Sequence, residues 1–176
     1  MKKQLPSIEE LDRIFTYDHE TGSLIRIASC AKRFIGKEAG CIMRQLGRDT
    51  CRSVSIDDIP YMAHRIIWKM VTRKEPPIGS HIDHIDGNPL NNKWSNLRIA
   101  TSAENGRNRK MKSTSVTRIK GVSAPKRREK SKKPYMAHIT VNGKCQHLGV
   151  YYTKGEAGAA YAKAAIRLHG EFARYR

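Results

Sequence analysis

Residues 80–110 alternate between short apolar runs and residues that break regular structure, and few folds accommodate this pattern. The first run stops at residues 86–88, Asp-Gly-Asn, which all favour turns. An irregular, Asn-rich stretch follows, and the chain becomes apolar again over residues 96–100. Thr101 and Glu104 then have the spacing of a capping box, which starts a helix. The segment is therefore predicted to form a strand, a long loop, a second strand and a helix.

Two oxygen-bearing side chains of this segment are placed to bind one metal ion. Asp83 lies on the first predicted strand and Asn105 in the first turn of the predicted helix. Both can converge on one cation, and oxygen ligands suit a hard ion such as Mg²⁺ better than a structural zinc. His84 follows Asp83, and neighbours on a strand point to opposite faces. The two can therefore flank one scissile bond only if the strand bends or ends there.

Positive charge is concentrated in the second half of the chain. The formal net charge is +18, and residues 101–176 hold 18 basic against 4 acidic residues. Within 107–133 there are twelve Lys and Arg and one acid, Glu129. The like charges in such a block repel one another. Binding to nucleic acid phosphates relieves this repulsion and releases counterions, which favours clustered Lys and Arg. Nucleic acid is therefore favoured as the partner over a solvated linker without a ligand.

The composition also excludes several classes of protein. No apolar stretch approaches the roughly 20 residues of a membrane span, and the first residues do not have the pattern of a signal peptide. The cysteines form no CxxC pair, so they are expected to be free thiols in a reducing cytoplasm. They are Cys30, Cys41, Cys51 and Cys145.

Secondary structure is predicted along most of the first 80 residues. Ser7 caps a short helix, strands are expected within 23–27, 36–43 and 50–56, and Asp57-Asp58 forms a turn. Apolar residues from 63 to 71 have helical spacing, and Pro76-Pro77 is expected to end that segment.

The last sixty residues are predicted to form a hairpin and a helix. Two strand-like runs, 135–141 and 145–152, are joined by Asn142-Gly143, a strong hairpin turn. Thr153 and Glu156 form a capping box that starts an Ala-rich helix, which Gly170 ends. Together with the first half, this arrangement predicts an α+β fold.

The run IDHIDGNPLNNKWSNLRIATSAEN resembles the ββα-metal, or His-Me finger, core of HNH endonucleases, closest to the phage and intron-encoded homing type. The family's Asp-His pair falls on Asp83-His84, its middle Asn on Asn96 and its final ligand on Asn105. Many relatives carry His at this last position. The upstream segments FTYDHETGSLIR and YMAHRIIWKM also resemble segments that precede the core in the homing subgroup.

The resemblance implies a chemistry for these residues. His84 would act as general base, and Asn96 would hold the loop that carries His84. Asp83 and Asn105 would hold one divalent cation, Mg²⁺ or alternatively Mn²⁺, with no small-molecule cofactor. The substrate would be double-stranded DNA, cut by a monomer in the cytoplasm of a bacterial or phage-infected host cell.

The tail resembles an Apetala-two (ethylene-response-factor) type DNA-binding domain, a small three-stranded sheet with one packed helix. Matching features are Lys120-Gly-Val, Leu148-Gly149 and the helix that ends in LHGEFA, while Tyr135 and His147 stand where Trp is common. The predicted domains are a nuclease region at 1–110 with its core at about 79–109, a basic linker at 111–117, and a DNA-binding domain at 118–176. The side chains expected to contact DNA are Arg65, Arg107, Arg109, Lys110, Lys120, Lys126, Arg127, Arg128, Tyr135, His138, Lys144 and His147.

Some alternatives remain open at this point. A non-enzymatic, sequence-specific DNA-binding regulator with a relict nuclease fold is the second function class, although the retained Asp83, His84, Asn96 and Asn105 favour the enzyme. His81 is expected to be a surface residue and Asp86 a turn residue, rather than further metal ligands. His64 either meets a phosphate beside Arg65 or has no task.

Overall fold

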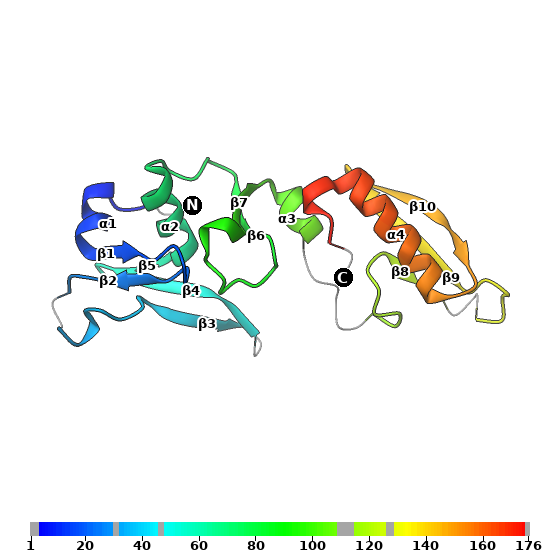
Figure 1. The fold of residues 1–176 in the computed structure, drawn as a ribbon. Coiled ribbons are helices and arrows are strands. Elements are labelled where there is room, and N and C mark those ends of the chain that lie inside the picture. Colours follow the sequence, from blue (N-terminus) through cyan, green and yellow to red (C-terminus); the bar gives the residue numbers. More distant parts are fainter. Residues whose placement is uncertain (1–3, 30–31, 46–47, 109–114, 126–128, 175–176) are drawn as a thin grey trace. The chain divides into compact units, whose positions relative to one another are not determined.

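The computed structural model describes residues 4–29, 32–45, 48–108, 115–125 and 129–174 (Figure 1). Its contacts divide the chain into two units, Met1–Thr101 and Ser102–Arg176. Helices combine with small antiparallel sheets in the described residues, which confirms the predicted α+β class. The predicted domain limits and linker stay a prediction.

The first unit consists of short elements around one apolar core. In chain order they are α1 (Ile8–Ile14), β1 (Phe15–Tyr17), β2 (Leu24–Arg26), η1 (Lys32–Phe34), β3 (Cys41–Gln45), β4 (Arg48–Ile56), β5 (Ile59–Met62), α2 (Ala63–Thr72), β6 (His81–His84), η2 (Trp94–Asn96) and β7 (Leu97–Ala100). Antiparallel pairing gives a β1-β2 ribbon, a β3-β4-β5 sheet and a β6-β7 ribbon. Leu11, Phe15, Ile66 and Ile67 are fully buried, so the core joins α1, β1 and α2.

Local signals account for several boundaries in this unit. Ser7 Oγ accepts a hydrogen bond from the Glu10 backbone N–H at 3.1 Å, as expected of a helix cap. Asp57 and Asp58 both have positive φ, 47° and 59°, and form the predicted turn between β4 and β5. The prediction for the end of α2 was wrong: Arg73 adopts a left-handed conformation and ends the helix before Pro76 is reached.

The second unit is a three-stranded antiparallel sheet with a helix on one face, preceded by a short helix (Figure 1). Its elements are α3 (Ser102–Asn108), β8 (Val122–Ser123), β9 (Tyr135–Val141), β10 (Lys144–Tyr151), α4 (Lys154–His169) and η4 (Gly170–Phe172). The strand order is β10-β9-β8. Ile139 packs against Tyr161, Ala164 and Ala165 of α4, because small residues let the helix lie close to the sheet.

The turns and caps predicted for this unit are confirmed. Asn142 and Gly143 have φ values of 50° and 77° and join β9 to β10. Thr153 Oγ1 accepts a hydrogen bond from the Glu156 backbone N–H at 3.1 Å, and Gly170 with φ 53° ends α4.

Two broader expectations concern the whole chain. Within the residues that the structure describes, no helix combines the length and apolarity of a membrane span. Cys41, Cys51 and Cys145 are free thiols, and Cys30 lies outside the described residues.

Candidate active site

Asp83 and His84 lie at the end of β6, where the strand gives way to a turn. Both are buried, with 5% and 8% of their surface exposed. The Gly87 backbone N–H donates to the His84 carbonyl oxygen at 2.7 Å, and Gly87 has φ 64°, which suits glycine. The strand therefore ends where the two side chains could serve one reacting group.

A hydrogen bond to Asn92 fixes the imidazole of His84. Nε2 lies 3.0 Å from the side-chain oxygen of Asn92, which is itself buried. An amide oxygen accepts hydrogen bonds, so Nε2 carries the proton and the lone pair of the neutral ring lies on Nδ1. The Tyr17 hydroxyl donates to the Asn92 carbonyl oxygen at 2.9 Å and anchors Asn92 from β1.

The sequence does not indicate the role of Asn92, because the residue lies in an irregular, Asn-rich stretch. Gly22, within the upstream segment FTYDHETGSLIR, is a weak sequence signal of a close contact with this stretch. Gly22 has φ 78°, and a Cβ there would come within 2.5 Å of the Lys93 backbone nitrogen. The turn before β2 therefore packs directly against the loop that follows His84 and contains Asn92.

Asn96 closes the loop that follows His84. Its side-chain oxygen accepts from the Asp86 backbone N–H at 3.0 Å, and its amide donates to the Asp86 carboxylate at 3.0 Å and to the Asn91 carbonyl at 2.8 Å. Burial raises the pKa of Asp86, but hydrogen bonds from Asn88, Asn91 and Asn96 outweigh it, so the pKa lies below the usual value. Asp86 thus organises the turn.

Asp83 forms a buried ion pair with Arg98, which lies directly opposite on β7. The Arg98 Nε and Nη2 donate to one carboxylate oxygen of Asp83 at 3.0 and 2.9 Å. Across the described ranges, no group of three or more His, Cys, Asp or Glu side chains could hold a metal ion. One carboxylate nevertheless fits Mg²⁺, which commonly takes one or two protein carboxylates, water and substrate phosphate oxygens.

A second histidine lies against the first. The rings of His64 on α2 and His84 meet edge to face, with centroids 5.3 Å apart. Burial, followed by repulsion from His84 and Arg65, lowers the pKa of His64 to about 3. His64 is therefore neutral at physiological pH, and His84 packs against an uncharged ring. The next residue, Arg65, is half-buried.

Asn105 is the second predicted metal ligand, whereas His81 is expected to be a surface residue. Asn105 lies on α3, which the contacts assign to the second unit, so its role as the second ligand stays a prediction. His81 is half-buried at the start of β6.

The predicted DNA-contacting residues of the second unit separate into groups. Arg107, Lys120 and His138 line one pocket, and His147, opposite His138 in the sheet, is exposed. Tyr135 instead packs against the apolar cluster that includes Ala157 of α4, because it shares a side of β9 with Ala137. Lys144 is exposed at the hairpin end. Outside the described residues lie Arg109, Lys110, Lys126, Arg127 and Arg128.

Comparisons with known proteins point to the same segment. A family model described as HNH endonuclease matches residues 61–107, which include α2, β6, β7 and most of α3. An uncharacterized HNH endonuclease of Acanthamoeba polyphaga mimivirus is 33% identical over 147 residues, or 84% of this chain and 67% of the relative. Protein 3.8 of Escherichia phage T7 is 37% identical over 113 residues, or 64% of this chain and 88% of the relative. No solved structure matches the chain significantly.

Proposed function

Because the chain belongs to the HNH endonuclease family, we propose that it is a metal-dependent endonuclease of the homing type that hydrolyses phosphodiester bonds of double-stranded DNA. The observation that carries the proposal is the pair Asp83-His84 at the end of β6, with the imidazole fixed by Asn92. A nuclease needs a base whose lone pair is held in one direction, and this hydrogen bond provides it.

His84 is proposed as the general base. Its neutral imidazole takes a proton from water as the water oxygen attacks phosphorus, and the bond from phosphorus to the 3′ oxygen breaks. The products carry 5′-phosphate and 3′-hydroxyl ends, and the leaving oxygen takes its proton from solvent. Asn92 and the neutral ring of His64 keep the imidazole in place during this transfer.

Asp83 and Asn105 are proposed to hold one divalent cation, Mg²⁺ or alternatively Mn²⁺. When bound, such a cation supplies positive charge that stabilises the transition state of phosphate cleavage. Because Arg98 donates to Asp83 in the structure, its guanidinium has to share this carboxylate or leave it. Asn96 positions the loop through Asp86 and takes no part in the proton transfer.

The second unit is proposed to direct the enzyme to its DNA as an Apetala-two-type domain. Its three-stranded sheet with α4 packed on one face supports this, because among the described residues His138 lies on the opposite side of β9 from the helix-facing Ala137 and Ile139. His138 and His147 pair across β9 and β10 away from the helix-facing residues. Tyr135 is not included in this proposed surface.

The proposed enzyme acts as a monomer. One relative is a protein of a bacteriophage, which supports the expectation that the chain works in the cytoplasm of a bacterial or phage-infected cell. Neither proposal affects the chemistry assigned to His84.

The test is a plasmid cleavage assay on the wild type and His84→Ala, with Mg²⁺, Mn²⁺ or a chelator. We expect metal-dependent nicking or linearisation by the wild type and a rate lower by a factor of about 10²–10⁴ for the variant. DNA binding, measured with chelator present, should stay within about twofold. Equal cleavage by the variant would rule out His84 as the base. Binding by both proteins without cleavage of a plasmid that carries a substrate site would favour the regulator.

A further inference from the structure

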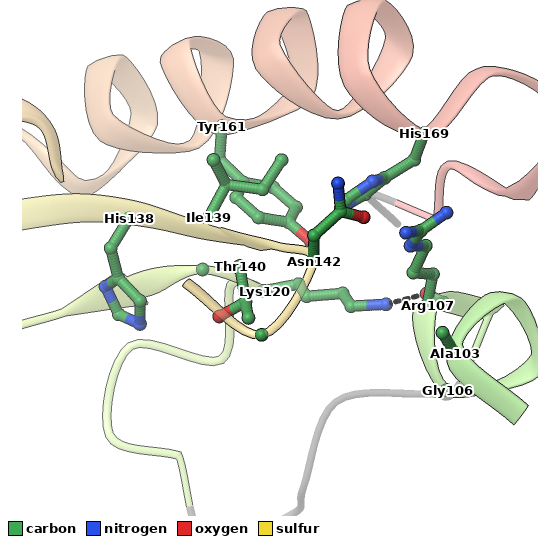
Figure 2. A pocket seen from close by; sticks show the side chains of 12 residues that line it. Ala103, Gly106, Arg107, Lys120, His138, Ile139, Thr140, Asn142, Tyr161 and His169 are labelled. Carbon is green, nitrogen blue, oxygen red and sulfur yellow. Dashed lines mark hydrogen bonds between the residues drawn. The ribbon is translucent and has the colours of Figure 1, made fainter. Parts of the chain in front are cut away.

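A pocket of about 430 Å³ lies within the second unit, between α3, the residues before β8, strand β9 and the end of α4 (Figure 2). None of the residues assigned to cleavage lines it. Several of its lining side chains carry positive charge or can donate hydrogen bonds, and they come from five separate parts of the unit. These are Arg107, Lys120, His138, Thr140, Asn142 and His169.

Two cationic side chains, Arg107 and Lys120, lie at one end of this pocket. The Lys120 ammonium donates to the backbone carbonyl of Arg107, as the dashed line in Figure 2 shows. Burial, with a smaller effect of Arg174, lowers the pKa of Lys120 to about 8. The described residues that line the pocket include no Asp or Glu. A lining of this sign favours an anion, since an anion stabilises the charged forms of both side chains.

His169 adds an independent indication of a ligand. It is 9% exposed, and its Nδ1 has no hydrogen-bond partner among the described residues. Burial and the neighbouring Arg107 lower the pKa of this imidazole, so the ring is neutral at physiological pH. A buried ring nitrogen without a partner is uncommon in folded proteins and calls for a group that is supplied from outside.

The floor of the pocket is closed and shaped. Gly121 has φ 71°, and a Cβ there would lie 1.9 Å from a ring carbon of Tyr161, so the backbone and the ring are in direct contact. In Figure 2, Tyr161, Ile139 and Thr140 lie between His138 at one end and Arg107 at the other. The volume exceeds what a single phosphate ion needs, and it leaves space for an attached sugar.

We propose that this pocket binds a backbone phosphate of DNA, with Arg107 and Lys120 facing its charge and Asn142 and Thr140 donating hydrogen bonds. The proposal rests on the DNA-directing role proposed for the second unit, but it does not need cleavage. Its ligand is a phosphate group, and the sources to be distinguished are a DNA strand and free phosphate.

The test compares Ala103→Glu with Ala103→Gln in the full chain. Ala103 lines the pocket from an exposed position on α3, so the first variant adds a carboxylate at the pocket and the second adds a neutral group of the same shape. DNA affinity is measured by fluorescence anisotropy with chelator present, over a range of salt concentrations. We expect Ala103→Glu to weaken binding about threefold to tenfold, as for the loss of one phosphate contact. Ala103→Gln adds the same bulk without the charge, so it should weaken binding clearly less than Ala103→Glu does.

A second pair of variants tests the cation itself. Lys120→Gln should lower the slope of log affinity against log salt concentration by about one, whereas Lys163→Gln, on the exposed side of α4, should not. Because Lys120 also holds the Arg107 carbonyl, a thermal unfolding curve accompanies this variant. If Lys120→Gln does not fold, the Ala103 pair still decides the question.

Titration with inorganic phosphate, followed through the ¹⁵N resonances of the His169 ring, distinguishes the two sources. Weak perturbation by phosphate together with impaired DNA binding of Ala103→Glu supports the DNA phosphate. Saturation by phosphate with unchanged DNA affinity of Ala103→Glu would overturn the assignment to DNA. No response in either measurement would overturn the pocket as a phosphate site. Because a chelator is present throughout, failure of the nuclease proposal would appear only in the plasmid assay.

Discussion

The candidate active site and the pocket of the second unit handle polar groups in opposite ways. Around β6, the carboxylate of Asp83 is paired with Arg98, and the amides of Asn92 and Asn96 are used to hold His84 and its loop. In the pocket, Arg107 and Lys120 stand among lining residues that include no carboxylate.

The difference is the one expected between a site for chemistry and a site for binding. Internal hydrogen bonds fix the direction of a base before the substrate arrives, which lowers the cost of reorganisation during reaction. A positively charged lining favours association with a polyanion and makes it depend on salt. The following predictions test whether the two places differ in this way, first in stability, then in rate, and last in affinity.

The largest effect is expected from removing Arg98. Arg98→Gln leaves the buried carboxylate of Asp83 without its ion pair, and the free energy of unfolding in urea should fall by about 3–5 kcal/mol. Part of this loss should return with Mg²⁺, since a cation at Asp83 replaces the missing charge. Arg73→Gln is the matched control, because its partner Asp12 and Arg73 itself are 41% and 59% exposed. A loss of at most about 1 kcal/mol is expected there. Equal losses for both variants would contradict a buried pair.

A smaller effect is expected from Asn92, which holds His84 without reacting. Asn92→Ala should lower the cleavage rate about 10–100-fold, the range seen when a group that orients an active-site ligand is removed. Asn92→Asp keeps an oxygen that accepts from Nε2 and should recover most of the rate. Single-turnover cleavage of a DNA duplex measures both. If Asn92→Asp is as slow as Asn92→Ala, Asn92 acts through packing and not through the hydrogen bond.

The smallest effect concerns the charge of Lys120. The pKa of Lys120 is about 8, lower than that of a free lysine. Its protonation therefore destabilises the folded chain below pH 8, and this destabilisation is lost as the pH rises above 8. The charged form is the one proposed to bind phosphate, so DNA affinity should fall about threefold to tenfold between pH 7 and 9. Arginine side chains stay protonated over this range, and the lowered pKa of His169 keeps its ring neutral. Anisotropy titrations should show a flat profile for Lys120→Gln, and a matching decline in this variant would assign the pH effect elsewhere.

Local sequence signals predicted the elements but not the contacts between them. The capping residues Ser7 and Thr153 and the turn at 142–143 act within a few residues, so their roles could be read from spacing. Pairing of Asp83 with Arg98 depends on the register between β6 and β7, which are joined by a long irregular loop. Sequence spacing does not fix that register.

Contacts between residues that the tertiary fold brings together could not be predicted from the sequence for the same reason. His64 comes to His84 from α2, and Tyr17 comes to Asn92 from β1. Tyr135 was assigned to the DNA surface by resemblance, but the alternation along β9 places it with Ala137 on the helix side. The pocket needs α3, β9 and α4 together, and no single segment indicates it.

The position of α3 has a consequence for how such enzymes could be recombined. The family match runs through this helix to residue 107, yet Lys120 holds the carbonyl of Arg107, and Arg174 donates to that of Asn108 at 3.5 Å. A chimera joined after residue 110 would keep Asn105, but the residues that contact α3, such as Lys120 and Arg174, would come from the other parent. A chimera joined before Ser102 would import Asn105 from the other parent. Under the roles proposed for Asn105 and the second unit, exchange of target specificity between relatives should require the donor to bring its own α3, because cutting and targeting would then share this helix.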